Sequence, residues 1–421
     1  MRRMAAVDAQ TWWMSGKLPN DQFLLYGFDG DAGALGAALD EVRTRAENCP
    51  DLALRIEDDL PLVYPRWAPR PVTDDQFVVH DPGAWTWNEC LDAVSALADD
   101  QLDATATTWR LHIYPRVAGM PRGDGSGVVA VLQIAHALAD GIRSSALAAR
   151  LFGRATPLDP IPNVRFPTAT LPVRAAQAAR AHRRLVADEA SGAVPSQACA
   201  RPVLRSNCAP AGARWVRTIV RDRAGICGPT VTVGVLSAIS TALSGHLRTF
   251  GDDPGSLGAE VPMAKAGPRR AHNHFGNVGI GLYPDVSDDE RIARIVDDFA
   301  QRRARAAHPA MIAASRAFAA TPAPLLRWGV AQFDPSLRSS VATGNTVVSS
   351  VNRGKADLRF GAAPVVVTAG YPALSPMMGL THGVHGIGDT VAVSVHTAES
   401  AIGGEAALDA YVARLEKALD G

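Results

Sequence analysis

The stretch TTWRLHIYPRVAGMPRGDGSGVVAVLQIAHALADGIRSSALAARLF, residues 107–152, predicts a strand, a loop, a second strand and a helix in direct succession. Residues 109–117 alternate in polarity as a strand does. Residues 127–135 form an apolar run rich in β-branched side chains, which is typical of a buried strand. Glycines and a proline mark the loop between the two strands, and residues 140–152 have the pattern of a helix.

The junction between the second strand and the helix carries the motif His136-Ala-Leu-Ala-Asp140-Gly141. An imidazole at this point can take a proton from an incoming nucleophile near neutral pH. Asp140 is expected to cap free amide groups of the helix or to pair with a distant arginine. Gly141 permits tight packing or an unusual backbone angle. Because a single HxxxD pattern also arises by chance, a purely structural histidine is the alternative interpretation.

The length of 421 residues exceeds that of one ordinary domain. Strands and helices are mixed in both halves, so the fold class is α/β or α+β with two lobes of similar size. Proline-rich segments place the boundary between residues 160 and 210. We therefore predict a first lobe over residues 1–165, a linker over 166–210 and a second lobe over 211–421. In the second lobe we expect strands at 214–221, 258–263, 278–283, 345–351, 363–370 and 389–396, and helices at 230–250, 287–319 and 403–419.

Charge and composition exclude several classes of protein. Lysine plus arginine equals aspartate plus glutamate at 42 each, whereas a nucleic-acid or anionic-membrane binder usually has a basic excess. The uncharged stretch 224–247 has the length of a membrane span, but its glycines, proline and hydroxyl residues favour a buried helix. The five cysteines are odd in number and lack a CxxC pair, which favours a reducing, cytoplasmic compartment over a disulfide framework or zinc ribbon. No apolar segment typical of a signal peptide follows the first residues.

Other common catalytic motifs are missing from the sequence. There is no GxSxG of a nucleophilic hydrolase, no Walker A pattern and no GxGxxG after a strand, so nucleotide cofactors have no support. The basic segment 174–185 is typical of a solvated helix face, and the alternative is peripheral contact with an anionic membrane or with the phosphates of coenzyme A.

Residues 107–152 resemble the wax ester synthase/diacylglycerol acyltransferase family, which has a Trp-Arg/Glu-x-His strand, an apolar strand and then HHxxxDG. Trp109, His112, His136, Asp140 and Gly141 fall at the matching positions. Four further segments also match the family, and all of the matches occur in the same order along the chain as in the family. These segments are AAVDAQTWWM (5–14), VPM (261–263) with FGN (275–277), VVSSVNRG (347–354) and YPALSP (371–376).

The resemblance implies the two-lobed chloramphenicol-acetyltransferase-like fold, with a tunnel between the lobes and His136 at its middle. It implies an enzyme, an O-acyltransferase, that moves an acyl group from an acyl-thioester to a hydroxyl acceptor by direct attack, with His136 as general base. Asp140 would be structural and pair with an arginine. Ser349, Ser350 and Asn352 would contact the substrate as candidate oxyanion donors. No cofactor or metal is implied, because acyl-CoA or an acyl-carrier protein serves as co-substrate.

The sequence also departs from the family pattern. Ala135 stands where the family has the first histidine of HHxxxDG. The family has an Asn-Asp pair after a Thr-Val dipeptide, and this pair is missing from residues 230–234 of the chain. Arg353-Gly354 stands where the family has Pro-Gly-Pro. These departures favour a divergent member. Two alternatives therefore stay open: a specialised condensation-type enzyme with a carrier-protein donor or an amine acceptor, and a non-catalytic acyl- or partner-binding protein.

Five histidines of the second lobe raise the question of a metal, namely His272, His274, His382, His385 and His396. Neither the HxH nor the HxxH among them has a carboxylate or cysteine at supporting spacing, so we predict no metal site. The matching region of the family lies near the tunnel, which makes His382 and His385 candidates for a loop contact with substrate.

Overall fold

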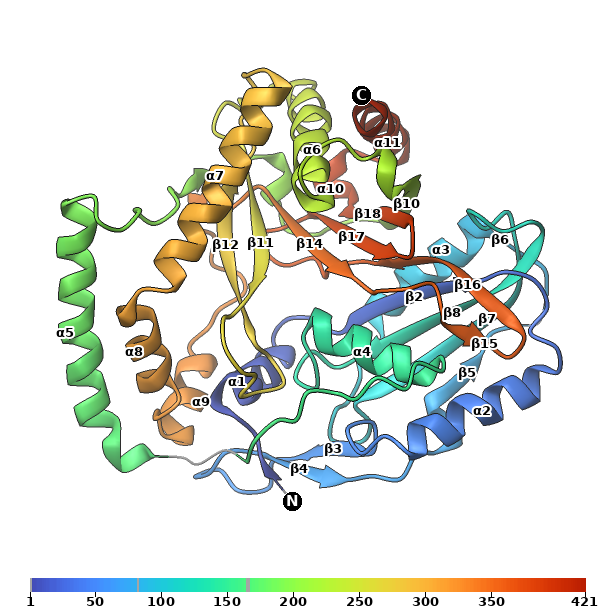
Figure 1. Cartoon of the computed structure of the whole chain (residues 1–421), viewed down its shortest axis with the longest axis horizontal. Helices are drawn as coiled ribbons and strands as arrows, with labels where there is room; N and C mark the ends of the chain where they lie inside the picture. The colour runs from blue at the N-terminus through green and yellow to red at the C-terminus, as the bar shows by residue number, and fades with distance from the viewer. Residues whose placement is uncertain (1, 82, 164–166) are drawn as a thin grey trace.

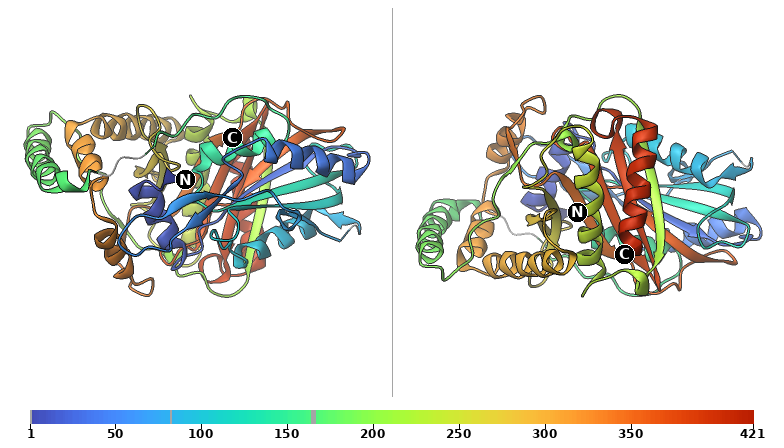
Figure 2. Two further views of the ribbon diagram at one scale, coloured as in Figure 1. Left: turned by 90° about the horizontal axis from the view of Figure 1, so that it is seen from below. Right: turned by 90° about the horizontal axis from the view of Figure 1, so that it is seen from above.

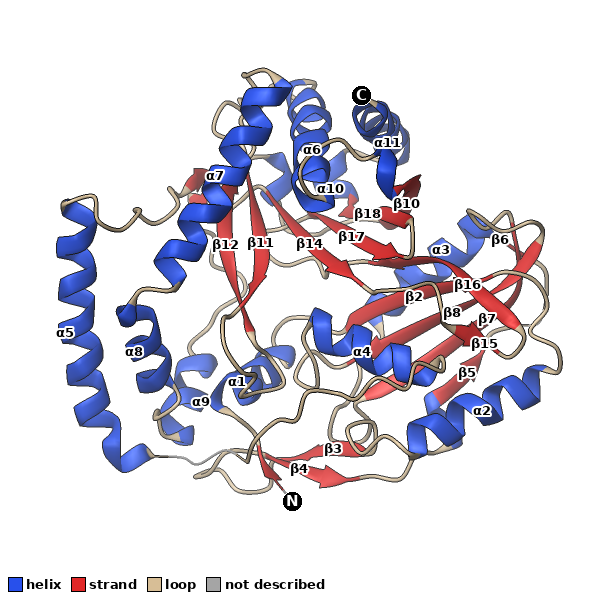
Figure 3. Cartoon of the chain, viewed as in Figure 1, coloured by secondary structure: helices blue, strands red, loops and turns tan. Residues whose placement is uncertain are grey.

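The chain, in a computed structural model, is described over residues 2–81, 83–163 and 167–421. Two sheets lie side by side, each with helices on its outer side (Figures 1 and 3). The predicted α/β class with two lobes is confirmed. The predicted boundary between residues 165 and 166 lies outside the described residues.

The first sheet has the strand order β15-β16-β2-β8-β7-β5, with β6 paired to β7. Its central pairs are antiparallel, and only the short β5 and β6 run parallel to β7. The bounds are β2 (Gln22–Phe28), β5 (Phe77–Val79), β6 (Trp85–Thr86), β7 (Trp109–Ala118), β8 (Ser126–Ile134), β15 (Arg359–Phe360) and β16 (Ala363–Gly370).

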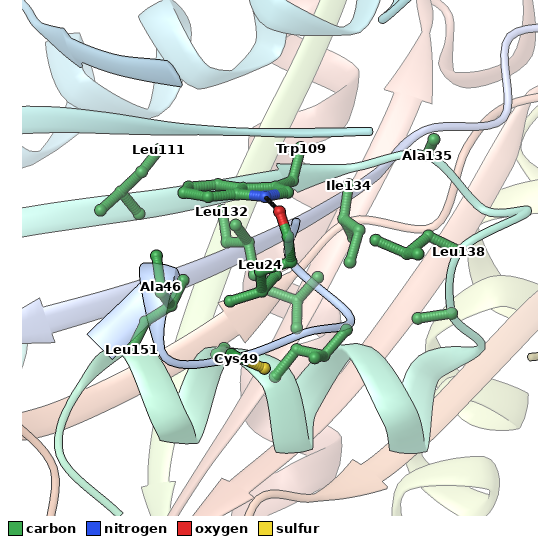
Figure 4. Close-up of a cluster of buried hydrophobic side chains, with 14 of the residues drawn as sticks. Leu24, Ala46, Cys49, Trp109, Leu111, Leu132, Ile134, Ala135, Leu138 and Leu151 are labelled. Atoms are coloured by element: carbon green, nitrogen blue, oxygen red, sulfur yellow. Dashed lines mark hydrogen bonds between the residues drawn. The ribbon is translucent and has the colours of Figure 1, made fainter. Parts of the chain in front are cut away.

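The central strand β8 is apolar without interruption because both of its faces are covered. Val128, Ala130 and Leu132 point into one core with helices α2 (Leu35–Glu47) and α4 (Gly141–Leu151). The alternate residues Val129 and Val131 point into a second core with α3 (Trp87–Ala96) and residues of the second sheet. Figure 4 shows the first of these cores, where the Trp109 indole donates to the Leu52 carbonyl at 2.8 Å. This packing fixes the end of β8 firmly in space.

The second sheet has the order β10-β18-β17-β14-β11-β12, and β14 runs parallel to both of its neighbours. Helices α6, α7 and α11 pack on its outer face with the sheet's apolar side chains (Figure 3). The bounds are β10 (Arg214–Asp222), β11 (Gly258–Ala264), β12 (Phe275–Gly281), β14 (Thr346–Asn352), β17 (Leu380–Ile387), β18 (Thr390–Ala398), α6 (Val231–Arg248), α7 (Asp288–Ala306), α10 (Glu399–Ile402) and α11 (Glu405–Asp420).

The uncharged stretch 224–247 folds mainly as the buried helix α6, as predicted. Among the described residues no helix combines the length and apolarity needed to cross a membrane. The single helical region expected over 287–319 is divided into α7 and α8 (Pro309–Phe318), because Pro309 starts a new helix with His308 as its N-terminal cap.

The remaining elements lie around the two sheets. Helix α5 contains the basic segment, buries only Leu185 and stands at one end of the molecule beside α8 (Figures 1 and 2). The bounds are α1 (Ala6–Ser15), α5 (Leu171–Ala190), α9 (Ala323–Ala331), β1 (Arg2–Arg3), β3 (Leu54–Glu57), β4 (Arg66–Pro69), β9 (Arg201–Pro202) and β13 (Val341–Ala342).

One feature departs from the predicted division at residue 211. Residues 359–370, from the second half of the chain, form β15 and β16 of the first sheet, where β16 pairs with β2. The first sheet is therefore built from both halves of the sequence, whereas all strands of the second sheet lie within residues 211–421. The crossover fixes the two lobes to each other through backbone hydrogen bonds.

Candidate active site

His136 lies where the chain leaves β8 and turns before α4. Its side chain is half-buried and lines a cavity of about 790 Å³ between the two sheets. The ring stacks on Phe275 of the second lobe with 5.7 Å between ring centroids. Burial lowers the pKa of His136 below the ordinary value, and Nδ1 has no hydrogen-bond partner among the described residues. The imidazole is therefore neutral near pH 7 and able to accept a proton.

Asp140 caps the first turn of α4 and pairs with an arginine of the other lobe. Its carboxylate accepts from the backbone N–H of Arg143 at 3.0 Å and of His274 at 2.8 Å. Arg269 donates to both carboxylate oxygens, at 2.8 and 3.1 Å. Burial opposes ionisation, but the Arg269 and backbone hydrogen bonds outweigh it and hold the pKa of Asp140 below its ordinary value. Both carboxylate oxygens of Asp140 are engaged in these contacts, and Arg269 is the arginine that pairs with it.

The loop 265–274, between β11 and β12, extends from the second sheet towards α1 and α4 of the first lobe (Figure 1). Asn273 donates from its side chain to the His136 carbonyl at 2.9 Å, and His272 Nδ1 lies 2.6 Å from the Leu138 carbonyl. Asp8 of α1 accepts from the backbone N–H of His272 at 3.0 Å and of Asn273 at 2.8 Å. Burial raises the pKa of Asp8 to about 7, although these N–H donors partly oppose the rise. The backbone around the candidate base is thus held from both lobes.

Gly141 begins α4 at the seam between the lobes. A Cβ added there would come within 3.2 Å of Val351 Cγ2 on β14. Of the two roles expected for this glycine, tight packing is the one that the structure supports.

The cavity wall contains residues from both lobes. Ser349 and Ser350 of β14 and His385 of β17 line it together with His136, Asp140 and Gly141. Ser350 Oγ lies 2.7 Å from Thr232 Oγ1 of α6. A smaller adjoining cavity of about 310 Å³ shares four lining residues with the first, Asp21, Phe23, Tyr371 and Ala373. Together the two cavities occupy the place where a tunnel was expected.

Two predicted substrate contacts lie elsewhere. Asn352 is exposed at the end of β14, where its side chain accepts from the Gly354 N–H at 3.0 Å. His382 is fully buried on the opposite face of β17 from the cavity and contacts Tyr411 Oη at 2.6 Å. The expected loop around His382 and His385 is in fact a strand, so residues three apart point to opposite faces. The predictions for Asn352 and His382 are corrected accordingly.

Three residues that the sequence did not single out complete the site: Asp8, Arg269 and Asn273. Asp8 lies inside the matched segment 5–14, which was the available signal. Arg269 and Asn273 lie in a loop without periodicity and give no signal of their own. Within the described residues, no group of three or more histidine, cysteine, aspartate or glutamate side chains is arranged to hold a metal ion.

Comparison with known proteins finds similar solved structures but no matching family model or curated protein. A wax ester synthase/diacylglycerol acyltransferase from Marinobacter aquaeolei VT8 superposes with a TM-score of 0.63 at 19% identity, over 99% of this chain and 98% of that one. A trichothecene 15-O-acetyltransferase from Fusarium sporotrichioides superposes with a TM-score of 0.59 at 13% identity, over 100% of this chain and 94% of the other.

A third similar structure is a mutant starter condensation domain of rhizomide synthetase, in complex with C8-CoA and Leu-SNAC. Its TM-score is 0.56 at 12% identity, with 99% of this chain and 93% of that chain covered. All three similarities extend over nearly the whole chain, so the protein has the two-lobed, chloramphenicol-acetyltransferase-like fold that these acyltransferases and condensation domains share.

Proposed function

We propose that the protein is an acyltransferase that moves an acyl group from an acyl-thioester to a hydroxyl acceptor, with His136 as the general base. The observation that carries the proposal is a neutral imidazole in the wall of the cavity between the lobes, held there by Asn273 and Phe275 of the second lobe. The fold shared with acyltransferases supports the same reaction class.

The proposed reaction proceeds in one transfer without a covalent acyl-enzyme. The imidazole of His136 removes the proton of the acceptor O–H while the oxygen attacks the thioester carbonyl carbon. The carbon–sulfur bond then breaks, and the thiolate leaves with the proton that His136 had taken. General base catalysis contributes roughly 10²–10⁴-fold, and much of the remainder comes from holding both substrates together in the cavity.

Charge that develops on the carbonyl oxygen needs hydrogen-bond donors. Ser349 and Ser350 are candidates because both line the cavity on the wall that the second lobe contributes. The Ser350 hydroxyl already shares a hydrogen bond with Thr232, so its orientation is restricted before substrate binds.

For the donor we propose acyl-CoA. A similar condensation domain is described in complex with C8-CoA, which supports a coenzyme A thioester in this fold. The assay below tests an amine acceptor directly, and a carrier-protein donor is the alternative that follows if no acyl-CoA is used.

The test is free-thiol release from acyl-CoAs ranging from acetyl to palmitoyl, each offered with alcohols and amines. Wild type is compared with His136→Ala and with His182→Ala, a matched control because His182 is exposed on α5. We expect acceptor-dependent release that His136→Ala abolishes and His182→Ala retains. Absence of release with every pair, from folded wild-type protein, rejects the acyl-CoA proposal. Equal release from wild type and His136→Ala rejects the role of the histidine.

A further inference from the structure

Arg353 is a buried cation in the cavity wall that has no anionic partner among the described residues. Its residue is 4% exposed, at the point where the chain leaves β14. Nη1 donates to the Leu25 carbonyl at 3.2 Å and to the Thr368 hydroxyl. The guanidinium also lies over the ring of Tyr26, 4.8 Å from its centroid. All of these partners are neutral.

The other buried arginines of the described chain differ in this respect. Arg143 pairs with Asp51 at 2.8 Å, Arg291 pairs with Asp288 at 2.6 Å, and Arg302 lies 4.0 Å from Asp298. Arg353 forms no such pair with any described carboxylate. Removing a charge from water without a counter-charge is costly, and arginine does not escape the cost by losing its proton.

Two buried nitrogen atoms at or near Arg353 have no hydrogen-bond partner among the described residues. They are Nε of Arg353 itself and Nδ1 of His385, which lines the same wall. A Cβ at Gly370 would lie 3.0 Å from Arg353 Nη2 and 2.7 Å from His385 Cε1, so both side chains pack directly against this glycine and lie close to each other.

The carboxylates that line the cavity are engaged elsewhere. Asp140 is bound by Arg269, and Asp21 accepts from the Leu102 N–H at 2.7 Å and from Gln133 Nε2 at 2.8 Å. Burial raises the pKa of Asp21 to about 6, which further reduces its negative charge at mildly acidic pH. Neither of these two carboxylates therefore supplies a counter-charge to Arg353.

Arg353 is displaced along the strands from His136. Its contact residue Leu25 pairs with Val131, three residues before the end of β8 at Ile134, which corresponds to roughly 10 Å of strand. His136 lies two residues beyond that end. An anion at Arg353 thus belongs to a part of the substrate remote from the bond that forms.

From these observations we propose that Arg353, together with His385, forms a subsite for a carboxylate at the non-reacting end of one substrate. The guanidinium offers planar, paired donors that match the geometry of a carboxylate. Two sources share this chemistry: an acyl donor whose chain ends in a carboxylate, and a hydroxy acid as acceptor. This inference deepens the proposed acyl transfer and rests on it for the identity of the substrates.

Binding is measured in His136→Ala protein, where turnover does not interfere, by isothermal titration calorimetry. Glutaryl-CoA is compared with pentanoyl-CoA, and 8-hydroxyoctanoate is compared with 1-octanol. We expect the carboxylate compound to bind more tightly in one of the two pairs. In a variant that also carries Arg353→Met, we expect that preference to fall by about 30-fold or more. Arg353→Lys keeps the charge without the planar fork, so it should lose part of the preference and serves as the readout if Arg353→Met does not fold.

The outcomes separate this proposal from the proposed function. A charge preference that disappears with Arg353→Met supports the subsite even if wild type shows no turnover. No preference in either pair overturns the subsite, even if acyl transfer is confirmed. A uniform weakening of glutaryl-CoA and pentanoyl-CoA also overturns it, because Arg353 would then act on the coenzyme A portion or on the fold.

Discussion

The ion pair between Asp140 and Arg269 gives the sharpest test of how the site is held. Both side chains are nearly buried, with 5% and 9% exposure. Arg269→Met removes the two guanidinium contacts and leaves the Asp140 carboxylate with only the backbone N–H groups of Arg143 and His274. Breaking a buried pair from one side costs about 3–5 kcal/mol. Because two N–H donors remain, we expect a loss of about 3 kcal/mol at pH 7.

The size of this loss should depend on pH. In wild type the pKa of Asp140 is lowered, so the pair contributes stability above the unfolded pKa and loses it as the pH falls through the folded pKa. In Arg269→Met burial dominates, and the pKa of Asp140 should rise above its unfolded value. The variant then protonates in mild acid, and its deficit should shrink as the pH falls from 7 towards 5.

The assay is urea unfolding of wild type, Arg269→Met, Asp140→Asn and the double variant. Since the double variant leaves no unpaired charge, we expect its loss to be smaller than the sum of the two single losses by about 2 kcal/mol. A loss below about 1 kcal/mol for Arg269→Met, or strict additivity in the double variant, would refute a buried and coupled pair.

Three further predictions concern activity. Burial lowers the pKa of His136, so kcat/KM should be flat at neutral pH and fall only as the pH drops through a midpoint below 6.5; a midpoint above 6.5 contradicts the assignment. Asn273→Ala removes the donor to the His136 carbonyl and should lower kcat roughly 10- to 100-fold in steady-state assays, and an unchanged kcat argues against positioning from the second lobe. Ser350→Ala should lower kcat by roughly 100-fold if the Ser350 hydroxyl stabilises the oxyanion. Asn352→Ala should leave kcat nearly unchanged because Asn352 is exposed, and a larger loss for Asn352→Ala than for Ser350→Ala would exclude Ser350 as the donor.

The elements around His136 can be predicted because their signals are local. The apolar run of β8, the loop before it and the capped start of α4 each depend on residues close in sequence. The prediction for Asp140 extends to a distant arginine, but the partner lies 129 residues away in an irregular loop. Nothing in the periodicity of the sequence selects Arg269 among the other arginines.

The errors also have physical causes. The strand expected at 363–370 forms as β16, but its place in the first sheet depends on pairing with β2, a long-range interaction that has no local signal in the sequence. A loop is the wrong prediction for the histidines of β17, because strand alternation separates His382 from His385. In the sequence Arg353 is only a departure from a motif, since burial without a counter-charge becomes visible only in three dimensions.

The way the lobes are joined restricts how substrates can reach His136. Opening the seam would break the buried pair of Asp140 and Arg269, the close packing of Gly141 on Val351 and the hydrogen bonds of β16 in the first sheet. Each of these contacts also positions the base or the wall beside it, so an opened molecule would lose the site that it exposes. Entry through the cavity that His136 lines leaves all of these contacts intact. Substitutions that narrow the mouth of this cavity should raise KM or slow substrate entry, whereas substitutions that loosen the seam should lower kcat and stability together.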